Sequence, residues 1–457
     1  MESWESRTRP AWFREEFEQH RSSRGAPLRL VYIPTHRDCP EVLGAVVAEV
    51  LTARERSTDE FRLLLIDDRP AALAEENRRA AERAAEEARQ VVTWLGTDAW
   101  AEFVAGLVAR AGLSDAESAE AREALLKPTG SYAGGMNKAA LVAARLGSAT
   151  LHRRDSDEFP AYDAVSGAGT LEVEIAMLGT ALPTGSGGHA APFMVGSSVD
   201  GEPTKDHRDL EEAGARFGAE LEALSRRRRA PGEERAAVVG GDIAVGAGLR
   251  VERDLVGRTQ VGVSASREVH HWIPEMPAVG VLGTDHFQKG LLYQLGLPVY
   301  WHPLRAYHRY EPWRADQADP EQLARYAVSE LRHAVLRHYW KTANEVIAGI
   351  GPGLFTGNGA FRSDLCADAF TGALIADLGP AEAVADAFVD VYTRAADAAA
   401  GAAAERLRIR VKALREERPR AVGYVREAIL EFARLTRLWP RLVGGARSLG
   451  AVARPGR

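Results

Sequence analysis

The sequence predicts an α/β protein in which a mostly parallel sheet is flanked by helices and followed by a helical C-terminal extension. Residues 28–35 and 61–68 are short apolar runs of the kind that forms strands buried on both faces. Apolar residues at helical spacing fill 40–54, and a helical stretch at about 70–88 precedes a third strand at 91–95. Strands that alternate with helices are typical of a parallel sheet covered on both sides.

The C-terminal extension is predicted from a helix start at Asp319. A capping carboxylate is followed by Pro320 and Glu321, which suit the first turn of a helix. Apolar residues then recur every four positions, at Leu323, Ala327, Leu331, Val335 and Tyr339. A glycine-rich break at 349–363 separates this helix from further helices that reach about residue 438. The 97–127 stretch is predicted to add helix within the first half.

Composition limits the classes of function. The 457 residues carry a formal net charge of -6, which argues against a dedicated nucleic-acid-binding protein. The only cysteines, Cys39 and Cys366, form no C-x-x-C pair, so a cysteine-based zinc site is excluded and a reducing, cytoplasmic location is expected. No secretory signal and no apolar stretch of about 18 residues is found, so no transmembrane segment is predicted.

Polar residues follow the first strands at the edge where ligands bind in such sheets. Pro34 and Thr35 end the first strand, and Asp67 and Asp68 end the second. In open α/β sheets the ligand crevice lies beyond the carboxyl ends of the strands. A glycine-rich turn at 130–135 then precedes a helix predicted from about Met136 to Arg145, in which Asn137 and Lys138 lie near the positive N-terminal end.

An Asp-x-Asp pair follows a short strand predicted at 149–153. If the chain turns there, Asp155 and Asp157 bring two carboxylates near one point, and oxygen ligands of this kind suit Mg²⁺ or Mn²⁺ bound to substrate phosphates. The alternative is a solvated acidic turn, which the neighbouring Glu158 favours. Asp-x-Asp alone does not decide between them, since the pattern is common in loops.

Taken in order, these motifs resemble those of GT-A glycosyltransferases, particularly family-2-like enzymes. The resemblance covers roughly residues 28–310. Its motifs are Ile33-Pro34-Thr35-His36-Arg37, Leu65-Ile66-Asp67-Asp68-Arg69, Gly134-Gly135-Met136-Asn137-Lys138, Asp155-Ser156-Asp157, Gly240-Gly241-Asp242-Ile243-Ala244-Val245, Gly283-Thr284-Asp285-His286-Phe287 and the segment from Tyr293 to Pro303. Thr284 stands where the family usually has Glu, which is a departure from its catalytic pattern. Each motif is modest alone, and their order carries the resemblance.

The resemblance implies a GT-A fold and roles for individual residues. Nucleotide-sugar binding is expected of Pro34, Thr35, Asp67, Asp68, Asn137, Lys138 and Asp155; a divalent cation, Mn²⁺ or Mg²⁺, is expected on Asp155, Asp157 and His308. Asp285 is the expected general base, because a carboxylate can take the proton of an attacking hydroxyl. Alternatives remain: Asp285 could cap the helix from His286 to Leu295, Asp67 could cap the helix after it, and Lys138 could be a surface lysine.

Two further regions have open interpretations. Histidines gather near the end of the resemblance, and His270-His271-Trp272 is interpreted as part of an acceptor pocket, whereas His302 is expected to be packed. The tail from 421 is basic and amphipathic, which fits either a surface for a membrane or partner, or a helix packed on the main domain. The second interpretation is favoured.

The resulting hypothesis is a metal-dependent glycosyltransferase that moves a sugar from a nucleotide-diphosphate sugar to a hydroxyl or amine of a small-molecule acceptor. Residues 1–27 are a lead-in, 28–160 the nucleotide-sugar-binding half, 161–315 the acceptor half, and 316–457 the helical extension, through which a homodimer is expected. The alternatives are a sugar-phosphate nucleotidyltransferase, a degenerate GT-A domain that only binds nucleotide, and a metal hydrolase. The turn at Pro34–Asp38 argues against the first, Thr284 keeps the second open, and the third lacks helical His-x-x-x-His spacing.

Overall fold

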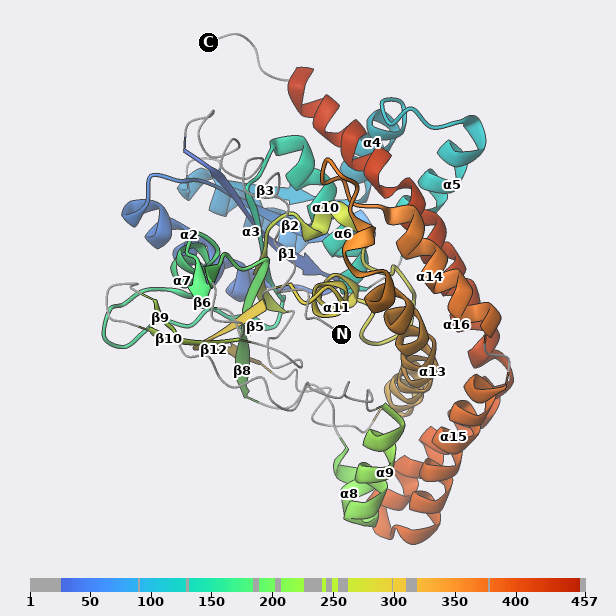
Figure 1. Ribbon diagram of the computed structural model, residues 1–457. Helices are drawn as coiled ribbons and strands as arrows, with labels where there is room; N and C mark the ends of the chain where they lie inside the picture. The colour runs from blue at the N-terminus through green and yellow to red at the C-terminus, as the bar shows by residue number, and fades with distance from the viewer. Residues whose placement is uncertain are drawn as a thin grey trace.

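The computed structural model describes residues 26–88, 91–128, 131–183, 189–201, 207–225, 241–243, 249–253, 262–297, 299–309, 319–376 and 379–452. A central sheet with helices on both faces forms one part of the molecule, and a column of long helices runs along its side (Figure 1). The strands are β1 (Leu28–Thr35), β2 (Glu60–Asp67), β3 (Val92–Leu95), β4 (Thr150–Arg154), β5 (Glu158–Phe159), β6 (Leu182–Pro183), β7 (His189–Ala190), β8 (Met194–Gly201), β9 (Gly241–Ile243), β10 (Leu249–Arg253), β11 (Val263–Ser266) and β12 (Val299–His308).

The main sheet is mostly parallel. Its order is β3-β2-β1-β4-β11-β8-β12-β10-β9, and β5 pairs with β12 off this path. Strands β3, β2, β1 and β4 are parallel neighbours, and β12 is parallel to β8. Strand β11 runs antiparallel between β4 and β8, so those two strands point the same way. The carboxyl ends of β1, β2 and β4 therefore meet at one edge.

Alternate residues of β1 are buried on opposite faces of the sheet. Leu30 and Tyr32 pack in a cluster with α4 (Thr97–Val108), α5 (Asp115–Leu126) and α6 (Tyr132–Leu146). Val31 and Ile33 pack on the other face, against α2 (Pro40–Arg56), α3 (Glu75–Glu87) and α7 (Thr170–Leu178). A strand needs apolar residues at every position only when both faces are covered, which is why this run is continuous.

Helix α6 begins earlier than the sequence predicts. Ser131 caps this helix by accepting a hydrogen bond from Gly134 N. The turn predicted at 130–135 is therefore wrong from residue 132 onward, where the chain is helical. Gly135 lies against the end of β1, where a Cβ on it would stand 2.5 Å from Pro34 Cβ. The glycines therefore permit close helix–strand contact rather than a turn.

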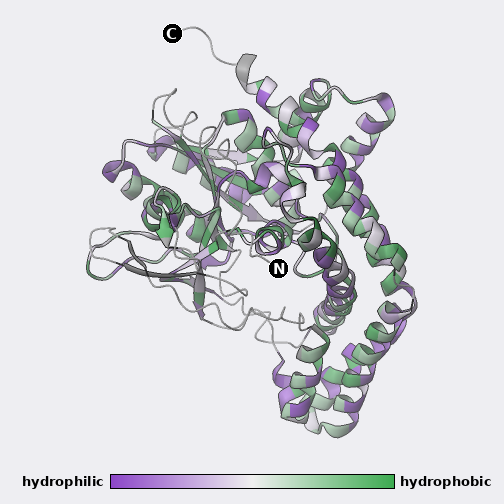
Figure 2. Ribbon diagram, in the orientation of Figure 1, coloured by the Kyte–Doolittle hydropathy of each residue, from purple (hydrophilic) through white to green (hydrophobic). Residues whose placement is uncertain are grey.

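The helical extension forms as predicted and extends further. Asp319 caps α13 by accepting a hydrogen bond of 2.9 Å from Glu321 N. The remaining helices are α8 (Arg208–Ala213), α9 (Ala215–Ser225), α10 (Val269–Trp272), α11 (Phe287–Gln294), α13 (Pro320–Ile350), α14 (Ser363–Ala376), α15 (Pro380–Ala398) and α16 (Gly401–Val452), with short 3-10 turns at Ala71–Leu73 and Gly351–Leu354. Their apolar sides face one another, as Figure 2 shows along the column.

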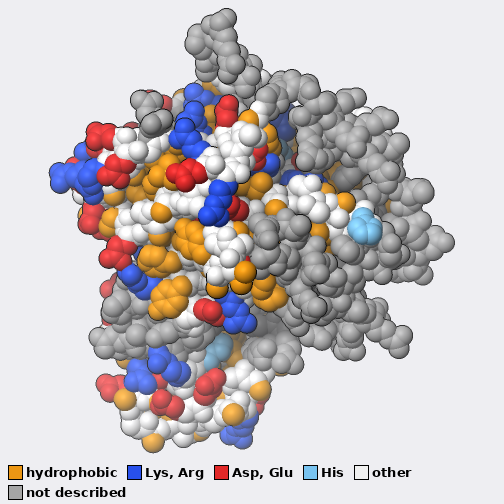
Figure 3. All heavy atoms as spheres, turned by 90° about the vertical axis from the view of Figure 1, so that its left-hand side faces the viewer, with side chains coloured by type: hydrophobic (Ala, Val, Ile, Leu, Met, Phe, Trp, Pro, Cys, Tyr) orange, Lys and Arg blue, Asp and Glu red, His pale blue; other side chains and the backbone are white. Residues whose placement is uncertain are grey.

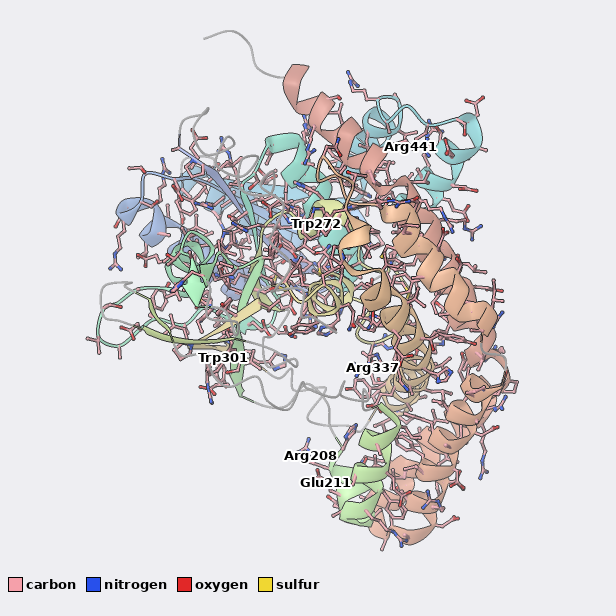
Figure 4. All side chains as sticks on the ribbon, viewed as in Figure 1. Arg208, Glu211, Trp272, Trp301, Arg337 and Arg441 are labelled. Atoms are coloured by element: carbon pink, nitrogen blue, oxygen red, sulfur yellow. The ribbon has the colours of Figure 1, made fainter. Side chains whose placement is uncertain are left out.

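The end of α16 folds back on the first half of the chain. Leu438, Trp439, Leu442 and Val443 are buried in the same cluster as α4 and α6. Arg441, at this end of α16 and beside α5, donates a hydrogen bond of 3.0 Å to Glu117 (Figure 4). The basic tail from 421 is thus a helix packed on the main domain, which confirms the favoured interpretation.

The α/β fold class is confirmed: a mostly parallel sheet lies between helices, and a helical C-terminal region follows. The assignment of the sheet domain to the GT-A type stays a prediction from the resemblance. In the ranges that the structure covers, no helix is both long and apolar enough to cross a bilayer. On the face seen in Figure 3, acidic and basic side chains of the described residues are interspersed. Gly240 and residues 244–245 of the glycine-rich motif lie outside the described residues.

Candidate active site

A pocket lies at the carboxyl ends of β1 and β2, where the sequence predicts the nucleotide-sugar. It is small and partly open to solvent, and it is lined by Pro34, Thr35, His36, Ile66, Asp68, Ser131, Tyr132 and Gly135. Thr35 is buried and closes the turn after β1, since its hydroxyl donates to Arg37 O at 2.7 Å and accepts from Arg37 N at 3.1 Å. The predicted residues Pro34, Thr35 and Asp68 therefore lie around one pocket.

Asp67 and Asp68 have different surroundings. The buried Asp67 accepts hydrogen bonds from Arg69 and from Asn77 Nδ2, the latter at 2.7 Å, so its carboxylate organises the turn and is not the cap of α3. Asp68 pairs with Lys138, whose ammonium also lies 5.4 Å from the centre of the Trp100 ring. The surface-lysine alternative for Lys138 is wrong, because this ammonium is held beside the pocket.

Arg153 links two residues with predicted roles: Asp155, expected to bind the nucleotide-sugar, and Asp285, the expected general base. Its guanidinium donates to both oxygens of Asp155, at 2.7 Å and 3.0 Å, and through Nη1 to Asp285 Oδ2 at 2.9 Å. The same group lies 5.0 Å from the centre of the Tyr132 ring in the pocket wall. Asp155 and Asp285, which are far apart in the sequence, are thus neighbours on one buried arginine.

Asp157 has different partners from Asp155. Its Oδ2 is 3.1 Å from Arg37 Nη1 and 3.5 Å from His308 Nε2, and all three side chains are largely buried. Asn77 Nδ2 also donates to Arg37 O at 2.8 Å, which links this pair to Asp67. Asp157 and His308 are thus neighbours, and arginines are paired with oxygens of both Asp155 and Asp157; the predicted metal-binding role of Asp155, Asp157 and His308 stays a prediction.

Glu158 is part of the same cluster. Asp155, Asp157 and Glu158 are only 8%, 5% and 4% exposed, so the solvated acidic turn is wrong. A Cβ on Gly262 would stand 2.5 Å from Glu158 Oε2 and 2.6 Å from Asp155 Oδ2, which places these two carboxylates over the same glycine. Glu158 Oε2 is buried without a hydrogen-bond partner.

The carboxyl groups of the cluster act on one another as well as on their cationic partners. Asp155 and Asp285 pair with Arg153, and Asp157 pairs with Arg37. Burial, together with the neighbouring Asp157, raises the pKa of Asp155 to about 6 against the effect of Arg153. Burial, Asp155 and Asp157 together raise the pKa of Glu158 well above its usual value.

A divalent cation is expected on the carboxylates of this cluster, since hard cations prefer oxygen ligands. Across the ranges described, no three Asp, Glu, His or Cys side chains are already arranged to hold a metal ion. Oxygens of Asp155 and Asp157 are paired with Arg153 and Arg37, so a bound ion would have to replace these contacts. Asp155, Asp157 and His308 are the residues that would hold the ion.

Asp285 interacts with Arg153 and with the neighbouring His286, and it does not cap α11. That helix is capped by the buried Glu275, which accepts from Phe287 N at 2.6 Å and Gln288 N at 3.1 Å. The helix-capping alternative for Asp285 is therefore wrong. Burial favours a higher pKa for Asp285, but His286 and Arg153 lower it to about 2, so this carboxylate is ionised at neutral pH.

Asn137 connects the two halves of the sheet domain. Its Nδ2 donates to Glu275 O and its Oδ1 accepts from Glu275 N, each at 2.8 Å. Asn137 thus links α6 to Glu275, and the carboxylate of Glu275 caps α11, the helix that follows Asp285. Its predicted contact with the donor stays a prediction, because in the structure its amide is engaged with this backbone.

The His270–Trp272 segment lies away from the cluster. Trp439 Nε1 donates to His270 O at 3.1 Å, and Arg447 contacts His271 Nδ1 at 3.2 Å. Trp272, the last residue of α10 (Figure 4), packs in an aromatic group with Phe193, Phe355 and Phe361. This arrangement favours an interdomain contact over an acceptor pocket. His302 is fully buried, as expected.

Sequence reasoning missed Arg153, Arg37, Glu158 and Glu275 as members of the site. The signal for Arg153 was present: His152-Arg153-Arg154 places charged residues in a strand predicted to lie inside a sheet, which requires buried partners. Glu158 directly follows the Asp-x-Asp pair. Glu275 carries no such signal, because its role depends on a contact 138 residues away along the chain.

Two of the solved structures that resemble this chain do so only weakly. A crystal structure titled as that of a mycobacterial protein has a TM-score of 0.37 and 14% identity, covering 72% of this chain and 80% of that one. Mannosyl-3-phosphoglycerate synthase from Rubrobacter xylanophilus has a TM-score of 0.37 and 14% identity, covering 73% and 79%. At this level neither structure bears on substrate or mechanism.

Among curated proteins none matches this chain. A family model does match, over residues 29–455, which is nearly the whole chain. Its description is a family of unknown function, DUF6271. The chain therefore belongs to the DUF6271 family.

Proposed function

We propose that this protein is a metal-dependent glycosyltransferase that transfers a sugar from a nucleotide-diphosphate sugar to a hydroxyl or amine of a small acceptor. The observation that carries the proposal is the buried acidic cluster of Asp155, Asp157 and Glu158 at the carboxyl end of β4, beside the pocket at β1 and β2. Buried carboxylates that raise one another's pKa values favour binding of a cation.

The donor is expected to span the pocket and the cluster. Thr35 and Asp68 would contact the nucleoside, and Lys138 would approach the diphosphate from the first turn of α6, where the helix dipole also favours an anion. Asp157 and His308 would hold a divalent cation together with Asp155. When bound, that cation would stabilise the negative charge of the departing diphosphate.

The acceptor is expected on the Asp285 side of Arg153. Asp285 is ionised at neutral pH and so can take the proton of an attacking hydroxyl. Its bond from Arg153, 2.9 Å long, would hold it at a fixed position relative to Asp155 and therefore to the donor. This arrangement supports transfer rather than simple nucleotide binding.

Binding is tested by thermal shift with UDP-, GDP- and dTDP-sugars, each with and without Mn²⁺. We expect one nucleotide-sugar to stabilise the protein only when Mn²⁺ is present, since a ligand that binds only the folded state raises its stability. Release of the nucleoside diphosphate in the presence of a mixture of small acceptors then tests turnover. Stabilisation by a nucleoside triphosphate with a sugar phosphate would favour a nucleotidyltransferase, and binding without turnover would favour a degenerate domain.

The matched variants are Asp157→Asn and Asp364→Asn. The first removes a buried carboxylate of the cluster, and the second an exposed one on α14, whose side chain is 62% exposed. Mn²⁺-dependent stabilisation should vanish in the first and persist in the second. Undiminished Mn²⁺-dependent binding and turnover in Asp157→Asn would contradict the proposal. The homodimer and the cytoplasmic location stay predictions.

A further inference from the structure

The loop that carries Asp285 contains neither helix nor strand. Residues 273–286 join α10 to α11, and Met276 N donates to Thr284 O at 3.2 Å where the loop returns toward its start. A segment without the regular hydrogen bonds of a helix or sheet keeps one conformation only if other parts of the chain supply partners for its backbone. The source of those partners therefore decides how firmly Asp285 is placed.

Two helices of the C-terminal extension supply such partners. From α13, His333 Nδ1 donates to Leu282 O at 2.6 Å, and from α16 the Tyr424 hydroxyl donates to Val279 O at 2.7 Å. The guanidinium of Arg332, the residue before His333, lies 3.8 Å from the centre of the Tyr424 ring, which links the two contacts. The extension therefore holds the loop at two of its carbonyl groups.

His333 also packs against the turn just before Asp285. Gly283 has a φ of +69°, in the left-handed region that favours glycine, and a Cβ on it would clash with the His333 ring, 2.5 Å from Cε1. Two helical turns further along α13, Trp340 stacks on Phe287, the first residue of α11, with ring centres 4.4 Å apart; Figure 1 shows α11 beside α13. One face of α13 thus holds the chain on both sides of Asp285.

We propose that the C-terminal helical region positions the proposed general base, with His333 as the positioning residue. Through the turn at 282–285, His333 keeps the Asp285 carboxylate at Arg153 without contacting the reacting atoms. The inference rests on the proposed function, because that function gives Asp285 its role. A small displacement of a catalytic group costs a large factor in rate, so the groups that support it matter to the reaction.

The test compares His333→Phe with His333→Asn. Phenylalanine keeps a ring against Gly283 and removes the donor, whereas asparagine keeps an N–H donor near the position of Nδ1. The kcat for release of nucleoside diphosphate from a UDP-, GDP- or dTDP-sugar should fall about tenfold to a hundredfold in His333→Phe, with the KM for that sugar unchanged, and recover in part in His333→Asn. His338→Phe is the control, because His338 lies on the same helix and contacts Tyr339.

Hydrogen exchange of the backbone amides at 276–287, followed by mass spectrometry, tests the positioning without substrate. His333→Phe should exchange faster in this segment than the wild type, and His333→Asn should lie between them. If His333→Phe does not fold, Tyr424→Phe decides, since it removes the bond to Val279 O and should also speed exchange and lower kcat.

Unchanged exchange or unchanged kcat in the folded variant would overturn the inference while leaving the proposed function intact. A loss of nucleotide-sugar binding that equals the loss of kcat would also overturn it, because general damage would then explain the effect. Absence of turnover by the wild type would overturn the proposed function, and the role of His333 in the reaction with it.

Discussion

Arg153 and Arg154 are consecutive residues of β4, but their side chains lie on opposite faces of the sheet. Arg154 donates hydrogen bonds to Glu49, Glu174 and one backbone carbonyl, at 2.8 Å to 3.0 Å. Glu174 also binds the fully buried His152 at 2.8 Å. On this face the side chains of Glu49, Glu174, Arg154 and His152 form one hydrogen-bonded network, as is required when charged groups are buried for structure.

The face that carries Arg153 is built differently. Arg153 and Arg37 hold three carboxylates of the cluster, and Glu158 Oε2 remains without a partner. The pocket lies beside this face, at the ends of β1 and β2. The comparison teaches that burial of charge alone does not distinguish the two faces of this protein; incomplete pairing next to a pocket is the feature on which the proposed site depends.

The largest expected effect lies on the Arg154 face. Arg154→Met should leave Glu49 and Glu174 buried without their cation and lower the free energy of unfolding by about 3–5 kcal/mol. Urea denaturation measures the change. Arg56→Gln is the control, since Arg56 is 49% exposed where it meets Glu172, and exposed pairs contribute ~1 kcal/mol or less. Equal effects of the two substitutions would contradict a closed structural network.

Asn137→Ala tests the connection between the donor and base sides. It removes both 2.8 Å bonds to the backbone of Glu275 and should cost about 2–3 kcal/mol of stability, because two buried groups lose their partners. Turnover should fall about tenfold or more while Mn²⁺-dependent nucleotide binding persists, since the residue acts on the position of Asp285. A loss of nucleotide binding that equals the loss of turnover would instead favour direct donor contact.

Replacing Arg153 sharpens the contrast with Arg154. Arg153→Gln should destabilise the protein by about 1–3 kcal/mol, less than Arg154→Met, because its partners Asp155 and Asp285 keep some contact with solvent. Mn²⁺ should recover part of this loss, whereas it should recover none in Arg154→Met. Melting curves of both variants with and without Mn²⁺ make the measurement, and identical responses to Mn²⁺ would remove the proposed difference between the faces.

The smallest effect is a pH dependence from Glu174. Burial raises the pKa of this carboxyl, but Arg154 and His152 lower it more, to about 2. A pKa below the unfolded value stabilises the protein above about pH 5, and this stability is lost as pH falls toward 2, by up to ~1.4 kcal/mol per pH unit. Glu49 opposes this, because burial raises its pKa. Glu174→Gln should make the free energy of unfolding depend less on pH in acid. An unchanged dependence would show that Glu174 does not cause this loss of stability.

Local sequence predicted the first strands and the start of the C-terminal helices because their signals are contiguous. Asp155, Asp157 and Asp285 were chosen as site residues through the resemblance, and their roles stay predictions. The apolar run of β1 requires two covered faces, and Asp319-Pro320-Glu321 marks the start of α13. The start of α6 was misplaced because Gly134 and Gly135 resemble a turn, whereas Gly135 serves contact with Pro34. Glu275 could not be found, since its role depends on the fold bringing Asn137 to it.

The central claim is that the acids after β4 hold a divalent cation against a nucleotide diphosphate. A crystal structure with Mn²⁺ and a nucleoside diphosphate tests it most directly, through the anomalous scattering of manganese. We expect one Mn²⁺ peak about 2.0–2.6 Å from an Asp157 carboxylate oxygen, with the nucleoside over Thr35 and Asp68. A nucleotide bound elsewhere, or a manganese peak away from Asp155, Asp157 and Glu158, would contradict the claim.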